Sequence, residues 1–184
     1  DIKSEVKINS KKDLFIYSYR VAGTVGLMMA KILNVKDKNS LRSAIDLGIA
    51  MQLTNISRDI VEDAKNNRFY ISHNFESIKE TLNTADLFYE SSFPSIKKIP
   101  FSFRFSILVA RRVYRKIGQN ILNKKTIENY NDSGKIYVTI FGKIIQTLLS
   151  LFDMIRLSLI KNKDHLRNEE HQLINEEINL DERL

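Results

Sequence analysis

Apolar residues recur at intervals of three and four along most of the chain, and strict alternation of apolar and polar positions is scarce. That spacing places the apolar side chains on one face of an α-helix. Ser10 and Ser40 are suited to cap the first two helices, and Pro94 and Pro100 bracket a connector. Polar breaks are expected at 34–39 and 129–134, and an extended loop at 69–74. Helices are therefore predicted over residues 11–33, 40–66, 76–91, 101–123 and 135–160.

The segment 135–160 is apolar enough to raise the question of a transmembrane helix. Lys143, Gln146, Asp153 and Arg156 interrupt it, which favours a buried or membrane-surface helix instead. Residues 161–184 are charged and low in aromatic residues, so they are expected to form a polar, solvated tail. We therefore predict an all-α protein with one domain over residues 1–160, followed by this tail.

Composition narrows the classes of function. The chain has 184 residues, 43% of them hydrophobic, and no cysteine, which excludes a thiolate metal site and fits a reducing, cytoplasmic compartment. His73, His165 and His171 show no metal-ligand spacing and are interpreted as surface residues. The net charge of +7 is scattered and lacks interleaved aromatic residues, so no nucleic-acid partner is expected. Residues 1–5 contain neither an initiator Met nor a signal peptide, and the chain is interpreted as starting inside a longer protein.

Asn55, Asp59 and Asp63 follow one another at steps of four residues. On a helix this spacing puts one amide and two carboxylates on one face over about 12 Å. Such oxygen ligands suit Mg²⁺, which completes its octahedron with waters and phosphate oxygens. The alternative is an ordinary solvated helix face. The apolar run that precedes this row favours burial, so the carboxylates require a compensating cation from Arg58, Arg68 or a metal.

Two longer segments carry a family resemblance. Residues 17–29 (YSYRVAGTVGLMM) and 47–63 (LGIAMQLTNISRDIVED), followed by 68–70 (RFY), resemble the squalene and phytoene synthase family, and most of all its phytoene synthase branch. The resemblance continues more weakly to about residue 150, through 110–114 (ARRVY) and 135–139 (KIYVT). It implies an all-α isoprenoid synthase bundle that is incomplete at its N-terminus.

The resemblance also implies roles for individual residues. Asn55, Asp59 and Asp63 would bind Mg²⁺, for which Mn²⁺ is a substitute. Asp59, Asp63 and Arg58 would be catalytic, and Gln52, Arg58 and Tyr114 would contact the substrate diphosphate. The apolar cavity would be lined by Tyr17, Val21, Val25, Ala44 and Met51.

The implied reaction joins two prenyl diphosphates head to head through a cyclopropylcarbinyl diphosphate. In the phytoene branch two geranylgeranyl diphosphates give phytoene for carotenoid biosynthesis, without NADPH. The alternatives are a squalene, dehydrosqualene or hydroxysqualene synthase that uses farnesyl diphosphate, a non-catalytic scaffold relative, and a basic helical protein that only docks on membranes. Because substrate and product are lipids, peripheral association with a membrane is expected.

The chain departs from the family pattern in specific places. The first Asp-rich motif should lie upstream of Tyr17 and is not contained in the sequence, so we expect this chain alone to be inactive. Lys135 stands where relatives carry Arg. Asp86 and Glu90 are interpreted as a surface pair. The small residues at 21–26 leave room either for a prenyl chain or for tight helix packing, and the sequence leaves both interpretations open.

Overall fold

A computed structural model describes residues 5–160, 165 and 169–177. These residues form helices almost throughout, which confirms the predicted all-α class. One short parallel pair of strands joins β1 (Val6–Lys7) to β2 (Arg68–Phe69). The helical elements are α1 (Lys11–Ser18), the π-helical segment η1 (Tyr19–Gly23), α2 (Thr24–Ile32), α3 (Lys38–Lys65), α4 (Phe75–Ser92), the 3₁₀ segment η2 (Pro94–Lys98), α5 (Phe101–Leu122), α6 (Ile127–Asp132), α7 (Ile140–Leu159) and α8 (Glu169–Glu177).

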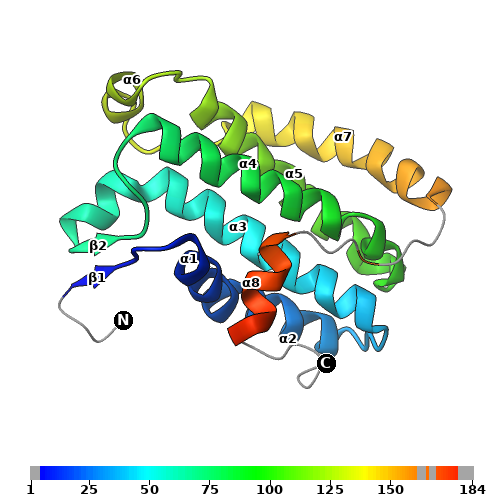
Figure 1. The fold of residues 1–184 in the computed structure, drawn as a ribbon. Coiled ribbons are helices and arrows are strands. Elements are labelled where there is room, and N and C mark those ends of the chain that lie inside the picture. The colour runs from blue at the N-terminus through cyan, green and yellow to red at the C-terminus, as the bar shows by residue number, and fades with distance from the viewer. Residues whose placement is uncertain (1–4, 161–164, 166–168, 178–184) are drawn as a thin grey trace.

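Helix α3 runs through the middle of the bundle, with α4 and α5 on one side and α1 and α2 on the other (Figure 1). Its residues Ile45, Ile49 and Leu53 are fully buried against these neighbours. Helix α7 packs along α5, away from α1 and α2. Any function carried by α3 is therefore held by contacts on several sides.

The helix predicted over 40–66 starts earlier than expected. Asp37 is its N-cap, because the Asp37 carboxylate accepts the Ser40 backbone N–H at 3.0 Å and the Ser40 hydroxyl at 2.6 Å. Ser40 therefore lies in the first turn and not at the cap. A carboxylate at this position is also stabilised by the positive end of the helix dipole. The predicted cap at Ser10 is confirmed, since its hydroxyl oxygen accepts the Asp13 N–H at 3.0 Å.

Several boundaries differ from the prediction. The polar turn expected at 129–134 is mostly helix α6, which Thr126 caps at Asn129. The helix predicted over 135–160 begins at Ile140, because Thr139 caps Gly142 there and 135–139 have no regular secondary structure. Part of the loop expected at 69–74 pairs as β2. Polar capping residues thus set helix boundaries that the spacing of hydrophobic residues alone does not predict.

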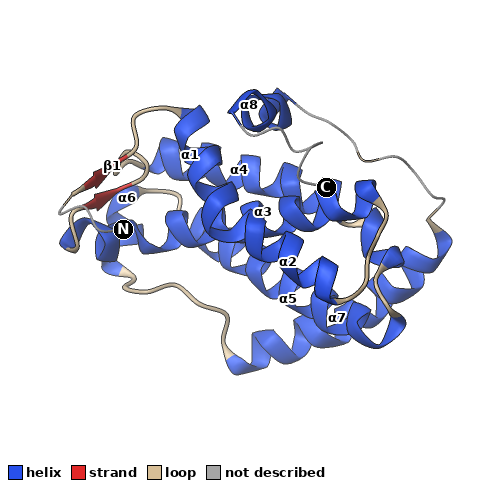
Figure 2. Ribbon diagram, turned by 90° about the horizontal axis from the view of Figure 1, so that it is seen from below, coloured by secondary structure: helices blue, strands red, loops and turns tan. Residues whose placement is uncertain are grey.

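The prediction of a solvated tail is wrong for the part of it that the structure describes. Helix α8 packs on α1, as Figure 2 also shows at one edge of the bundle. Within it, Ile174 joins the main core cluster and His171 is buried. Only one narrow face of α8 is apolar, so the average composition of the segment gave no indication that this helix packs on the bundle. The rest of 161–184 lies outside the described residues.

Helices α2 and α3 approach each other closely at two glycines. A Cβ on Gly26 would lie 2.1 Å from the Ala44 carbonyl oxygen, and one on Gly48 would lie 2.2 Å from the Ala22 carbonyl oxygen. Neither distance is tolerated between non-bonded atoms, so both positions require glycine. Tight helix packing, one of the two interpretations of the small residues at 21–26, is therefore confirmed for Gly26.

Helix α7 keeps a stripe of large apolar side chains in solvent. These are Ile140, Phe141, Ile144, Leu148, Phe152, Ile155 and Leu159. Among the described helices, none combines the length and the hydropathy that crossing a bilayer demands. The stripe is therefore a surface feature of a helix whose other side packs on α5.

Candidate functional site

An apolar cavity of about 480 Å³ lies beside α3. Along α3 its wall extends from Ser40 to Asn55, which corresponds to about 22 Å of helix. Helices α2 and α5 and the residues around η2 supply the remaining walls. The larger polar side chains of the lining are Gln52, Asn55 and Tyr114, and the first two stand at the end of the wall nearest Asp59; the remaining polar lining consists of serine hydroxyls. The cavity is thus a long apolar groove with a polar end.

Most of the residues predicted to line this cavity lie on its wall. Val21 and Val25 face it from η1 and α2, and Ala44 and Met51 face it from α3. Val21 and Val25 are also about half exposed, so the groove is open to solvent on the α2 side. That these residues contact substrate stays a prediction.

Tyr17 departs from the expectation, because it is not part of the described cavity wall. Its hydroxyl donates to the Tyr70 hydroxyl at 2.9 Å, and the two rings stack with centroids 4.8 Å apart. Burial and this hydrogen bond raise the pKa of Tyr17. The physical reason for its position is this contact with Tyr70, which directs the Tyr17 ring toward the residue that follows β2 instead of along the groove.

The predicted row lies in the C-terminal half of α3, where Asn55 belongs to the polar end of the cavity and Asp59 and Asp63 follow beyond it. The Asp59 carboxylate is held by Arg58, with Nε–Oδ1 at 2.8 Å and Nη2–Oδ2 at 2.5 Å. Lys135 Nζ lies 3.7 Å from Asp59 and 2.8 Å from the Glu62 carboxylate. Lys135 therefore contributes charge to this site as a point cation, where a bidentate Arg would be expected from the family pattern.

Asp63 has the most unusual environment of the row. Burial, and then the nearby negative charge of Asp59, raise the pKa of Asp63 to about 6, although Arg68 opposes the shift. A carboxyl group with a pKa in this range is incompletely neutralised by its protein neighbours. An additional cation would therefore stabilise the ionised Asp63 carboxylate.

The row fits a divalent metal on two further grounds. The Asn55 Oδ1 atom is buried and has no hydrogen-bond partner among the described residues, an arrangement that costs free energy unless a ligand satisfies it. All three side chains offer hard oxygen atoms, which Mg²⁺ prefers. Asn55, Asp59 and Asp63 are thus the residues that would hold a divalent metal ion, with Arg58 beside them.

Comparison with known proteins agrees with this geometry. The family model described as "Squalene/phytoene synthase" matches residues 3–75, which include the cavity wall of α2 and α3 and the whole acidic row. Residues 3–75 of the chain are thus similar to the squalene/phytoene synthase family. The all-α bundle of the chain accords with the isoprenoid synthase fold that the sequence resemblance implied.

Individual relatives support the phytoene branch of this family. The chain is 37% identical over 139 residues to a 15-cis-phytoene synthase of Enterobacter agglomerans, covering 64% of the chain and 47% of that relative. It is 37% identical over 127 residues to one from a Paracoccus strain, covering 59% and 42%. Against phytoene synthase 1 of Zea mays, a chloroplastic protein, identity is 28% over 162 residues, covering 71% and 40%. The chain spans about half the length of such squalene/phytoene synthase relatives.

The structure also brings together residues that sequence reasoning separated. His165 and His171, interpreted as surface residues, are buried beside Asp46. His73 is exposed as predicted and lies 2.9 Å from Asn131. The one signal in the sequence for this cluster was Asp46, because it lies inside an apolar helical run. A buried carboxylate needs a hydrogen-bonding or charged partner.

The raised pKa of Asp63 predicts a stability effect. Protonation of Asp63 favours the folded state, so this contribution is present below the unfolded pKa of 3.8 and is lost as the pH rises through about 6. Without divalent metal, Asp63→Asn should therefore stabilise the protein at pH 7.5 and do so less at pH 5. Because water screens a half-buried carboxylate, the gain should stay below about 1 kcal/mol. Urea denaturation at both pH values measures it.

Asp132→Asn provides the control for that measurement, because Asp132 is an exposed carboxylate on α6. It should change the free energy of unfolding little at either pH. A loss of stability in Asp63→Asn at pH 7.5 would contradict the environment described for Asp63.

Proposed function

We propose that the full-length protein containing this chain is a phytoene synthase, which condenses two geranylgeranyl diphosphates head to head in carotenoid biosynthesis. The proposal is supported by the curated relatives named 15-cis-phytoene synthase. The family similarity of residues 3–75 favours a prenyl-transferring enzyme over a protein that only docks on membranes.

One observation carries the proposal. The apolar groove along α3 ends at Gln52 and Asn55, and the oxygen row continues from there to Asp59 and Asp63 on the same helix. A prenyl diphosphate has the same distribution of polarity, with a long apolar chain and a strongly anionic head. The chain would lie in the groove, and the diphosphate would lie at the acidic end through metal ions.

Each polar residue then has a separate task. Arg58 is fixed by its two hydrogen bonds to Asp59, so its charge is already in place as negative charge grows on the departing diphosphate. Gln52 and Tyr114 lie on the cavity wall, where they orient the diphosphate and its bound waters. When bound, Mg²⁺ supplies Lewis-acid stabilisation of the leaving group.

The apolar wall has a chemical task as well. Ionisation of an allylic diphosphate leaves a carbocation that water would quench, so the groove must be dry around the reacting carbons. Val21, Val25, Ala44 and Met51 supply that apolar lining. The cyclopropylcarbinyl diphosphate would be ionised in the same groove, and the final cation would lose a proton. No nicotinamide reductant is needed for that last step.

We also propose that the protein acts at the surface of a membrane on the cytoplasmic side. The support is the exposed stripe on α7, from Ile140 to Leu159, together with the exposed Lys143 on the same helix. An apolar helix face with basic residues beside it suits the boundary between lipid headgroups and acyl chains. Docking there would shorten the path of lipid substrates into the enzyme.

Product analysis tests the function directly. The full-length protein is incubated with Mg²⁺ and either C15 or C20 prenyl diphosphates, without NADPH, and extracts are examined by chromatography and mass spectrometry. A C40 hydrocarbon from the C20 substrate is expected, and EDTA should abolish it. A C30 product from the C15 substrate alone would replace the proposal with a farnesyl-using synthase. No condensed product from either substrate would favour the scaffold alternative.

A further inference from the structure

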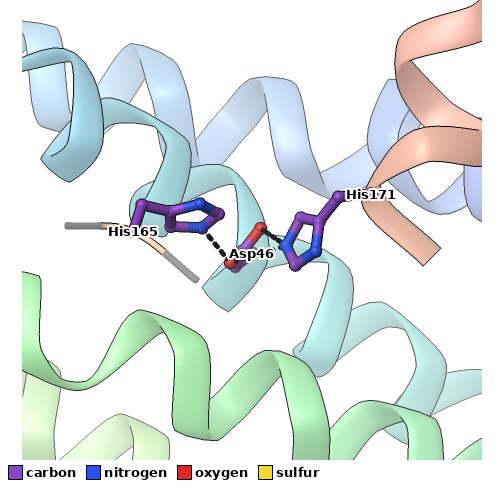
Figure 3. A group of neighbouring side chains, drawn as sticks. All are labelled: Asp46, His165 and His171. Atoms are coloured by element: carbon purple, nitrogen blue, oxygen red, sulfur yellow. Dashed lines mark hydrogen bonds and ion pairs between the residues drawn. The ribbon is translucent and has the colours of Figure 1, made fainter. Parts of the chain in front are cut away.

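A second group of ligand-type side chains lies on the other side of α3 from the prenyl groove. Asp46 of α3, His165 and His171 of α8 point toward one another, with the carboxylate between the two imidazoles (Figure 3). The Nε2 atom of His165 is 2.6 Å from Asp46 Oδ2, and that of His171 is 3.0 Å from Oδ1. Their side chains are only 2%, 2% and 7% exposed for Asp46, His165 and His171.

We propose that Asp46, His165 and His171 bind one Zn²⁺ ion that fastens the C-terminal helix to the bundle. Their potential ligand atoms all lie within 4.8 Å of one another. Two imidazoles and a carboxylate form a ligand set typical of Zn²⁺, whereas Mg²⁺ and Ca²⁺ prefer oxygen atoms alone. In a tetrahedral Zn²⁺ site with bonds of about 2.0 Å, the ligand atoms are about 3.3 Å apart. The Asp46 carboxylate would need to move away from each imidazole by less than an ångström, and the most distant pair of ligand atoms would need to approach by at most about 1.5 Å.

The surroundings offer space and a further donor. A void of about 10 Å³ is lined by Asp46, His165, His171 and Asn175, together with Arg42, Ile45 and Ile174. This volume corresponds to about one water-sized sphere. The Asn175 Oδ1 and His165 Nδ1 atoms are buried without a hydrogen-bond partner among the described residues. The fourth position around the ion is thus available to Asn175 or to a water.

Neighbouring residues hold the ligands in place. The Ser91 hydroxyl lies 2.5 Å from Asp46 Oδ2 and orients the carboxylate. The Phe88 ring packs on the His171 ring with centroids 5.0 Å apart. Such supporting contacts commonly fix the orientation of metal ligands.

The ion would join segments that lie far apart in the sequence. Ile174 of α8 already contributes to the main core, and α8 contacts α1. An ion that binds only the folded state stabilises it by mass action. Asp46 precedes Asp59 by about 20 Å along α3, so this site is separate from the proposed Mg²⁺ row.

Metal binding by the full-length protein tests the proposal. Co²⁺ is used as a spectroscopic substitute for Zn²⁺, and Zn²⁺ affinity is measured by competition with a chromophoric chelator. The wild-type protein should show the visible absorption of tetrahedral Co²⁺ at one equivalent, and an excess of Mg²⁺ should not abolish it. His171→Gln and His165→Gln should each weaken Zn²⁺ binding by more than about 100-fold, because even supporting contacts account for 10–100-fold.

His73→Gln is the matched control, because it removes the one remaining histidine of the chain, which is exposed. It should leave the Co²⁺ spectrum and the Zn²⁺ affinity unchanged. Zn²⁺ should also protect the C-terminal segment from limited proteolysis in the wild type but not in His171→Gln. A wild-type protein without the tetrahedral Co²⁺ spectrum, whatever the variants do, would reduce the cluster to hydrogen bonds and overturn the proposal.

Discussion

Asp59→Asn should reduce the rate of prenyl condensation by the full-length enzyme by roughly 10³-fold or more, the upper end of the cost of removing one group that stabilises transition-state charge. The change replaces a metal-binding carboxylate by a neutral amide and leaves one acceptor oxygen where two now fix the Arg58 guanidinium. Both effects act on the departing diphosphate. Steady-state turnover at saturating Mg²⁺ measures the loss, and circular dichroism verifies the helical content.

Asp86→Asn is the matched control for this loss. Asp86 and Glu90 on α4 are exposed and form ion pairs with Arg115 at 2.6 Å, as the interpretation of a surface pair requires. Turnover should be nearly unchanged, since exposed ion pairs contribute little. Asp63→Asn should lose turnover like Asp59→Asn while gaining stability in the absence of metal. Full activity in either row variant would refute the metal assignment.

Gly26→Ala and Gly48→Ala should each lower the free energy of unfolding by about 3 kcal/mol, the upper part of the usual range for overpacking. The added methyl group would meet a backbone carbonyl oxygen at 2.1 or 2.2 Å, and a backbone cannot move aside as a side chain can. Helices α2 and α3 would have to separate, which would also change the cavity wall. Urea denaturation of the full-length protein measures the loss.

Gly118→Ala shows what the same substitution does without a backbone clash. Its Cβ would lie 3.3 Å from the end of the flexible Leu82 side chain, and alanine has the higher helix propensity. We expect stability to be unchanged or slightly higher. If Gly26→Ala behaves like Gly118→Ala, the close approach of α2 and α3 is not as described.

The sequence predicted the helical class and the acidic row because both depend on spacing within one helix. Asn55, Asp59 and Asp63 share a face of α3 wherever the rest of the chain goes. The cavity positions of Val21 and Val25 followed from the family resemblance, whereas Tyr17 did not lie with them. Tyr17 stacks on Tyr70, which is 53 positions away, and helical periodicity carries no information on such a contact.

Long-range partners lay beyond the reach of sequence reasoning. Asp46 and His171 are 125 positions apart, and nothing in their local sequences pairs them. The same holds for Lys135, which reaches Asp59 and Glu62 from the far side of α6. The polar composition of 161–184 also outweighed the few apolar residues that dock α8. Tertiary contacts of this kind override local composition.

The π-helical segment Tyr19–Gly23 sets the phase of the helix that follows it. The wider turn holds one residue more than an α-helical turn, so α1 and α2 keep the phase of one continuous helix on either side of it. Deleting one residue of the segment could convert it to regular α-helix with α2 kept in place. Deleting one residue inside α2 would instead turn the side chains beyond it by about 100°, away from the groove. The π-helical segment is therefore the place in this helix where the loss of one residue is best tolerated.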